Sequence, residues 1–323
     1  MIKLPENPAV SDLVPLLELE NADELFVLAD KVRKEYCGDV VHIRAILEFS
    51  NYCRCNCAYC GLFAKNKELV RYRMTPEEIV KTAIKTDEAG YKTLVLQSGE
   101  DLYYTKEILG DIIKEIKKKT SLKITLSVGE RPFDHYEYWR ECGADRYLIK
   151  HETADEILYN KYHSSSFENR FECQKNIFDL GYELGSGFMV GLPGQTTKIL
   201  AKDILHLKEL KVKMAGIGPY ICHEKTALRG NPDGDAFMTL KALAVARIVL
   251  KDVNLPSTTA LNIKGGLTDA LNCGANVIMQ KVTPANVRDL YDIYPGRESK
   301  ATDYKTQLEK LKTDLLLIGR KGI

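Results

Sequence analysis

From residue 41 onward the sequence alternates short runs rich in β-branched and aromatic residues with stretches of helical periodicity. This alternation is typical of parallel strands joined by helices. It predicts eight strands, over residues 41–49, 93–97, 123–127, 146–150, 184–190, 215–220, 257–261 and 277–279. Because eight such units close into a ring, we predict an α/β fold, a complete (β/α)8 barrel of the TIM type. Periodicity by itself also permits an open, doubly wound sheet.

The two ends of the chain have helical patterns. Leucines at near-helical spacing in residues 1–40 predict a helical cap on the bottom of the barrel. Apolar residues that step by four and three predict an amphipathic closing helix over residues 302–318. We therefore expect an N-terminal helical segment (1–40), the barrel (41–296) and a C-terminal segment (297–323) whose helix packs on the barrel.

Charge and composition exclude several classes of function. Lys and Arg total 46 against 45 Asp and Glu, so the formal net charge is +1, and no block of like charge stands out. A nucleic-acid groove or a polybasic membrane patch is therefore not expected. The sequence has neither a basic start followed by an apolar stretch nor a run of ~18 apolar residues, which predicts a cytoplasmic protein.

Four of the nine cysteines lie between residues 53 and 60, directly after the first predicted strand. Without a secretion signal, this density indicates thiolates that hold a metal. If Cys55 is left out, Cys53, Cys57 and Cys60 have the spacing Cys-x3-Cys-x2-Cys. Three thiolates on one loop can bind three irons of a cubane cluster and leave the fourth iron open to a small molecule. The alternative is a structural zinc site completed by Cys55 or a nearby His.

This loop resembles the cluster loop of radical S-adenosylmethionine (SAM) enzymes, in Cys53, Cys57, Cys60 and in Tyr59 before the last Cys. The resemblance implies two cofactors, a 4Fe-4S cluster and SAM. In such enzymes the amino and carboxylate groups of SAM chelate the open iron. An electron from the cluster then cleaves the sulfonium to give a 5′-deoxyadenosyl radical. Cys55 has no role in this pattern and is expected to be an inert spectator.

Other strand ends carry groups suited to SAM. Gln97 and Ser98 precede a Gly that lets the chain approach a ligand, although an ordinary turn is the alternative. Glu152 is expected to accept hydrogen bonds from the ribose hydroxyls, and Arg170 to pair with the SAM carboxylate, although a surface ion pair is the alternative. Tyr291 is expected to contact the adenosyl group.

A second set of residues predicts a substrate site deeper in the barrel. Arg146 begins the fourth predicted strand, and Thr258 and Thr259 lie on the seventh, so together they could bind a carboxylate or a similar anion. Met279 and Tyr294 would close the top of this site. The alternative is that Arg146 pairs with a local acid such as Asp145 or Glu130 and meets no ligand.

Long segments between about residue 40 and about residue 296 are similar to one family of radical SAM enzymes, the FeFe-hydrogenase maturase HydE. They are residues 71–80, 94–101, 151–154, 166–170, 189–196, 216–219 and 273–279. The resemblance implies assembly of the hydrogenase di-iron site from an anionic, cysteine-derived or iron-cysteine substrate. It also implies two kinds of partner, the other hydrogenase maturases and an electron donor such as a ferredoxin or flavodoxin.

One departure from the family bears on function. No Cys follows Cys273, so the usual C-terminal trio for an accessory cluster is missing and we expect one cluster. Another substrate therefore stays open, as in a methylornithine-synthase-like mutase or a biotin-synthase-like sulfur donor. The sulfur donor is disfavoured because Cys142, Cys173 and Cys273 fall on predicted helices rather than on strands. An iron-sulfur carrier or scaffold is the alternative outside enzymes.

Overall fold

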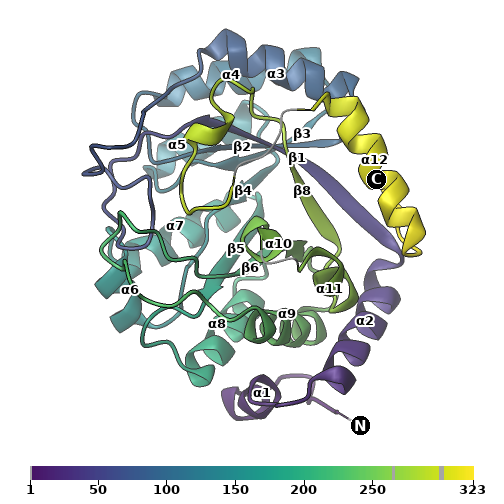
Figure 1. Ribbon diagram of the computed structural model, residues 1–323. Coiled ribbons are helices and arrows are strands. Elements are labelled where there is room, and N and C mark those ends of the chain that lie inside the picture. The colour runs from purple at the N-terminus through teal and green to yellow at the C-terminus, as the bar shows by residue number, and fades with distance from the viewer. Residues whose placement is uncertain (1, 264–265, 298–301) are drawn as a thin grey trace.

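The structure is a computed structural model that describes residues 2–263, 266–297 and 302–323, and eight parallel strands form a ring within those residues (Figure 1). The strands are β1 (Val40–Ser50), β2 (Thr93–Ser98), β3 (Lys123–Ser127), β4 (Arg146–Leu148), β5 (Glu183–Val190), β6 (Met214–Pro219), β7 (Pro256–Ser257) and β8 (Val277–Lys281). Their order is β6-β5-β4-β3-β2-β1-β8-β7, and a parallel bridge between Met214 and Asn254 joins the two ends. The predicted (β/α)8 barrel is confirmed.

Successive side chains along each strand point to opposite faces of the sheet and so lie in two different environments. Gln97, Ser127 and Leu148 line a cavity inside the ring. Their neighbours Leu96 and Leu126 are fully buried on the opposite face. These outward apolar side chains form the core between the strands and the surrounding helices.

Helices surround the ring. They are α1 (Val10–Leu17), α2 (Asp23–Cys37), α3 (Pro76–Glu88), α4 (Lys106–Lys119), α5 (Phe133–Glu141), α6 (Glu156–Tyr162), α7 (Phe167–Asp179), α8 (Thr197–Glu209), α9 (Ala236–Leu250), α10 (Thr259–Ile263), α11 (Leu267–Asn272) and α12 (Tyr304–Leu317), with a 3-10 turn at Arg288–Leu290. The start of α3 is a capping box, in which Thr75 and Glu78 exchange backbone-to-side-chain hydrogen bonds of 3.2 and 2.7 Å.

The two ends of the chain pack on the outside of the barrel (Figure 1). Helices α1 and α2 lie against α8, α9 and α11. At the other end, the Tyr304 hydroxyl at the start of α12 donates to the carbonyl of Val282 at 2.6 Å, just beyond β8. A short strand, β9 (Lys321–Gly322), then pairs with the start of β1. Residues 298–301 of the predicted C-terminal segment lie outside the described residues.

The seventh predicted strand is wrong in its extent. Only Pro256 and Ser257 form β7, and α10 begins at Thr259. The cause is capping by Thr258, whose carbonyl accepts from Asn262 N at 2.9 Å and whose hydroxyl lies 3.4 Å from Leu261 N. The chain therefore turns into a helix at the mouth of the barrel, so Thr258 and Thr259 lie at a helix start rather than along a strand.

No helix in the described ranges is long and apolar enough to cross a membrane.

Candidate active site

A cavity of about 360 Å³ lies inside the ring at the carboxyl ends of the strands. Most of the predicted site residues line it, namely Tyr59, Cys60, Gln97, Ser98, Glu152, Arg170, Thr258, Thr259, Met279, Tyr291 and Tyr294. A larger groove of about 640 Å³ lies on the outside, between α3 and α4, and none of these residues lines it. The predicted site therefore corresponds to the internal cavity.

The cysteine loop follows β1, and Arg71 holds its shape. The Arg71 guanidinium donates to four carbonyl oxygens that flank the loop, those of Asn51, Leu62, Phe63 and Asn66, at 2.5, 3.0, 2.8 and 3.5 Å. Such a fork fixes the backbone on the carboxyl side of Cys60 relative to the end of β1. Sequence reasoning did not single out Arg71, because it is separated from the cysteines by a stretch without periodicity.

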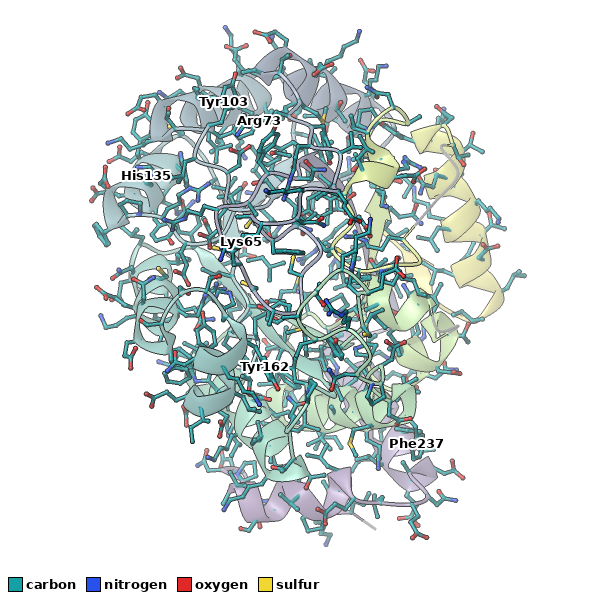
Figure 2. The ribbon with its side chains drawn as sticks, turned by 60° about the vertical axis from the view of Figure 1, so that its left-hand side comes forward. Lys65, Arg73, Tyr103, His135, Tyr162 and Phe237 are labelled. Carbon is teal, nitrogen blue, oxygen red and sulfur yellow. The ribbon has the colours of Figure 1, made fainter. Side chains whose placement is uncertain are left out.

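A second anchor joins the start of the loop to the segment after β2. Arg73 binds Asp101 at 2.7 Å, and Asp101 also accepts from the Ser50 hydroxyl at 2.6 Å. The Arg73 guanidinium lies over the Tyr52 ring at 3.7 Å and the Tyr103 ring at 4.8 Å, and Figure 2 shows Arg73 and Tyr103 together at this rim of the barrel. The residues on either side of the cysteines are thus held by charged, partly buried contacts.

The thiols of the loop differ in their acidity. The pKa values of Cys53 and Cys57 are lowered, mainly because Cys55 donates hydrogen bonds to both; for Cys57, His163 adds to the effect. The same hydrogen bonds raise the pKa of Cys55. Burial raises the pKa of Cys60, which lines the cavity. The direction of the pKa shift thus distinguishes Cys55 from Cys53 and Cys57, and the backbone N–H of Cys55 donates to Cys53 Sγ at 3.4 Å.

The donor set of this loop fits an iron-sulfur cluster. Three thiols on one loop can each bind a separate iron of a cubane, a wider arrangement than ligands around one ion. In the part of the chain that the structure describes, no group of three or more His, Cys, Asp and Glu side chains is placed to hold a single metal ion.

Glu152 is held in a conformation that points to a ligand. Its φ is +61°, and its backbone bonds to Gly187 O and from Met189 N at 3.0 and 3.1 Å fix it against β5. Lys150 Nζ lies 3.2 Å from Glu152 Oε2, yet this buried oxygen accepts no hydrogen bond from any described residue. A cavity oxygen that is ion-paired with Lys150 but accepts no hydrogen bond suits the hydroxyl groups of a ribose.

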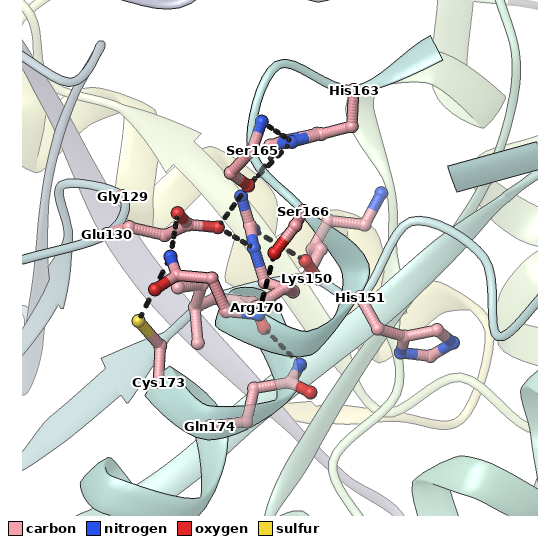
Figure 3. A network of polar contacts seen from close by, with 12 residues as sticks. Gly129, Glu130, Lys150, His151, His163, Ser165, Ser166, Arg170, Cys173 and Gln174 are labelled. Carbon is pink, nitrogen blue, oxygen red and sulfur yellow. Dashed lines mark hydrogen bonds and ion pairs between the residues drawn. The ribbon is translucent and has the colours of Figure 1, made fainter. Parts of the chain in front are cut away.

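Arg170 lies in a network that Figure 3 shows from close by. It donates from Nε to Glu130 at 2.7 Å and from Nη1 to the Lys150 carbonyl at 2.7 Å, while Nη2 lies 2.9 Å from His163 Nε2. Burial raises the pKa of Glu130, but Arg170 and Ser165 outweigh it and the net pKa is lowered. A guanidinium has five N–H groups, so these three contacts leave two for a ligand.

Gln97 and Ser98 lie where the second strand ends. Gln97 donates to the Tyr291 hydroxyl at 3.2 Å, which connects β2 to the segment after β8 across the cavity. The Ser98 hydroxyl donates to the Gly99 carbonyl at 2.7 Å. A side chain at Gly99 would meet Tyr52 O at 2.2 Å and Cys53 Cβ at 2.8 Å, so this glycine lets the cysteine loop approach the end of β2.

The prediction that Arg146 shares a site with Thr258 and Thr259 is wrong. Arg146 starts β4 at the opposite end of the barrel, where its Nε donates to Glu183 Oε2 at 2.6 Å. The space there is about 10 Å³, and Leu148 and Met214 lie between it and the cavity. The alternative, in which Arg146 pairs with a local acid, agrees with the structure, and the acid is Glu183. The reason is that the first residue of a parallel strand lies at the end remote from the active-site mouth.

Two cations of the cavity were missed. Alternate residues of a strand point to the same side, so residues 146, 148 and 150 of the predicted fourth strand point inward. This alternation would have identified Lys150 as a residue of the cavity. Arg297 lies beyond β8 and binds the fully buried Glu48. Nothing in the pattern of residues 291–297 indicates that contact, because Glu48 is distant in the sequence.

A sequence model of the Radical SAM superfamily matches residues 47–207. The barrel, the three-thiol loop at its mouth and this match define a radical SAM enzyme, with a 4Fe-4S cluster and SAM as cofactors.

The chain is 54% identical over 278 residues to the FeFe hydrogenase maturase subunit HydE of Thermotoga maritima, which covers 85% of this chain and 80% of that protein. It therefore belongs to the HydE family. It is also 30% identical to 3-methylornithine synthase of Methanosarcina acetivorans, over 93% of this chain and 87% of that protein. The crystal structure of methylornithine synthase PylB superimposes with a TM-score of 0.86 at 27% identity, over 98% of this chain and 94% of that chain.

Proposed function

We propose that this protein cleaves SAM reductively and uses the resulting radical on an anionic, cysteine-derived or iron-cysteine substrate during assembly of the FeFe-hydrogenase di-iron site. The observation that carries the proposal is the position of the cysteine loop. Its last thiol, Cys60, and its Tyr59 line the same cavity as Glu152 and Arg170. The family relationship to HydE supports the pathway.

In this proposal Cys53, Cys57 and Cys60 hold one 4Fe-4S cluster. Glu152 accepts hydrogen bonds from the ribose of SAM, and Arg170 uses its remaining N–H groups on the SAM carboxylate. Tyr59, Gln97, Ser98 and Tyr291 complete the SAM pocket. When bound, the cluster and SAM together supply a 5′-deoxyadenosyl radical.

The chain's own residues confine the radical. Thr258, Thr259, Met279 and Tyr294 form the part of the wall assigned to the substrate. Tyr291 is 3% exposed, and its hydroxyl accepts a hydrogen bond from Gln97. Tyr291 therefore joins the part of the cavity assigned to SAM to the part assigned to the substrate. Walls around the reacting groups limit side reactions of a radical with water.

We further propose that the three segments 1–40, 41–296 and 297–323 act as one unit around this site, and that the protein works in the cytoplasm. None of its nine cysteines, all within the described ranges, forms a disulfide, which suits a reducing compartment. The other hydrogenase maturases and a ferredoxin or flavodoxin are the proposed partners.

The test is in two parts. The anaerobically reconstituted, reduced protein is incubated with SAM, and 5′-deoxyadenosine is quantified; we expect its formation. The gene is then introduced into a hydrogenase-producing host that lacks its own HydE, and we expect hydrogenase activity to return. Formation of 5′-deoxyadenosine without restored hydrogenase would keep the radical chemistry and refute the pathway.

A methylornithine-synthase-like mutase is the second candidate, favoured by the extent of the match to that enzyme at 30% identity and by the fold similarity. The discriminating trial supplies L-lysine to the reduced enzyme with SAM. Conversion to a branched isomer would favour the mutase, and unchanged L-lysine would favour the maturase.

A further inference from the structure

Two spaces meet at the top of the barrel. The internal cavity adjoins an outer pocket of about 490 Å³, lined by residues that include His223, Arg288 and Asp292. Tyr291 and Arg297 line both spaces. These two side chains therefore lie between the outer pocket and the cavity.

The Arg297 guanidinium is buried but incompletely satisfied. Its side chain is 8% exposed, and it donates from Nη2 to Glu48, which is 0% exposed. Nε and Nη1 have no hydrogen-bond partner among the described residues. Leaving buried N–H groups of a charged side chain without an acceptor is costly, so an acceptor from a ligand would bind favourably here.

Charge is unbalanced among the described residues of this wall. Glu48 is contacted by Arg297 and, at 3.9 Å, by Lys281, so in that part of the chain two cations meet one carboxylate. The opposite wall is balanced, with Lys150 on Glu152 at 3.2 Å and Arg170 on Glu130 at 2.7 Å. In the outer pocket, Asp292 is already engaged by His223 at 3.2 Å. The excess positive charge of the site thus lies beside Arg297.

The guanidinium is also fixed in direction. Its central carbon lies 5.4 Å from the centroid of Tyr291 and 5.1 Å from that of Tyr294. Tyr294, Thr258 and Thr259 line the same cavity. Arginine keeps a planar array of donors when it packs against rings, so this array is pre-organised beside the threonine hydroxyls of the cavity.

We propose that Arg297 binds a carboxylate of the substrate, at the wall between the outer pocket and the cavity. This inference rests on the proposed function, because it assigns the anion site that the proposed substrate needs. It gives Arg297 the part that sequence analysis assigned to Arg146.

The experiment measures binding to the reconstituted enzyme with SAM bound, by isothermal titration calorimetry. The probe is S-methyl-L-cysteine, and its partner is 2-(methylthio)ethylamine, which has the same chain without the carboxylate. We expect the unaltered protein to prefer S-methyl-L-cysteine. Arg297→Met should weaken that binding about tenfold or more, as loss of a charge-assisted hydrogen bond does. Binding of the amine should stay unchanged.

Two variants keep the result interpretable. Arg297→Lys keeps a positive charge beside Glu48 but loses the planar array of donors. This variant should therefore fold even if Arg297→Met does not, and it should bind the carboxylate probe several-fold more weakly than the unaltered protein does. Arg146→Met is the matched control and should bind both probes normally. SAM affinity and iron content, measured on every variant, should not change.

Three results would overturn the assignment: normal binding of S-methyl-L-cysteine by Arg297→Lys and Arg297→Met, weakened binding by Arg146→Met, or equal or undetectable binding of both probes to the unaltered protein. Failure of the proposed function would look different, since the unaltered protein would then form no 5′-deoxyadenosine from SAM.

Discussion

The two ends of the barrel contain similar residues but differ in the room around them. At the amino ends of the strands, Arg146 is paired with Glu183, and Arg44 contacts the Met214 sulfur at 2.9 Å, around a space of about 10 Å³. At the carboxyl ends, Arg297 and Arg170 border a cavity of about 360 Å³. A buried arginine thus indicates a ligand only where space and free donors accompany it.

The largest effect is expected at the carboxyl end, in the cysteine loop. Cys57→Ala should abolish both the cluster and 5′-deoxyadenosine formation, because two remaining thiolates cannot hold the cubane in the proposed way. Iron and sulfide content and the visible absorption of the anaerobic protein check this.

Cys55→Ala is the matched control two residues away, and it should retain the cluster, since Cys55 stands outside the Cys-x3-Cys-x2-Cys spacing of Cys53, Cys57 and Cys60. The ligand assignment fails if Cys55→Ala loses the cluster and Cys57→Ala keeps it.

A smaller effect is expected at the wall that binds SAM. Glu152→Gln keeps the size of the side chain but removes the charge from Oε2, which is ion-paired with Lys150 and accepts no hydrogen bond from the described residues. SAM should bind about tenfold more weakly or worse, as a lost hydrogen bond to a charged group costs ~1.5–3 kcal/mol. Equilibrium dialysis with SAM on cluster-loaded protein measures this. Unaltered affinity in both Glu152→Gln and Arg170→Ala would refute the SAM site.

Two glycines of the barrel allow the effect of filling the cavity to be distinguished from the effect of disturbing side-chain packing. Gly216 and Gly218 both line the cavity. A Cβ at Gly216 would come no closer than 3.9 Å to a surrounding atom, Ser186 O, whereas one at Gly218 would meet Thr258 Oγ1 at 2.6 Å. Gly216→Ala should therefore leave the melting temperature unchanged and slow substrate-dependent turnover. Gly218→Ala should lower the melting temperature by displacing Thr258. Equal melting temperatures for both variants would contradict this distinction.

The smallest effect is expected at the amino end. Arg146→Met removes an ion pair whose acid, Glu183, is half-exposed, so the free energy of unfolding should fall by no more than about 1 kcal/mol. Urea unfolding measures it. A large loss of turnover in this variant, with normal stability, would show that the two ends are not as different as the structure indicates.

Features that depend on residues close together in the sequence were predicted correctly. Strand 123–127 has the predicted bounds, and the cysteine loop lies at the cavity as expected. Prediction failed where a contact joins distant segments. Thr258 looked like a strand residue because its capping role depends on Leu261 and Asn262, and Arg297 could not be found because its partner Glu48 lies on β1. The prediction placed Arg146 in the wrong part of the barrel because Arg146 is the first residue of its strand, and the cavity lies at the other end of the strands.

The most direct test of the account is a crystal structure of the anaerobically reconstituted protein with SAM. The account predicts one cluster bound by Cys53, Cys57 and Cys60, with SAM in the cavity and its ribose on Glu152. A cluster held by Cys55, or SAM bound outside the ring of strands, would contradict it.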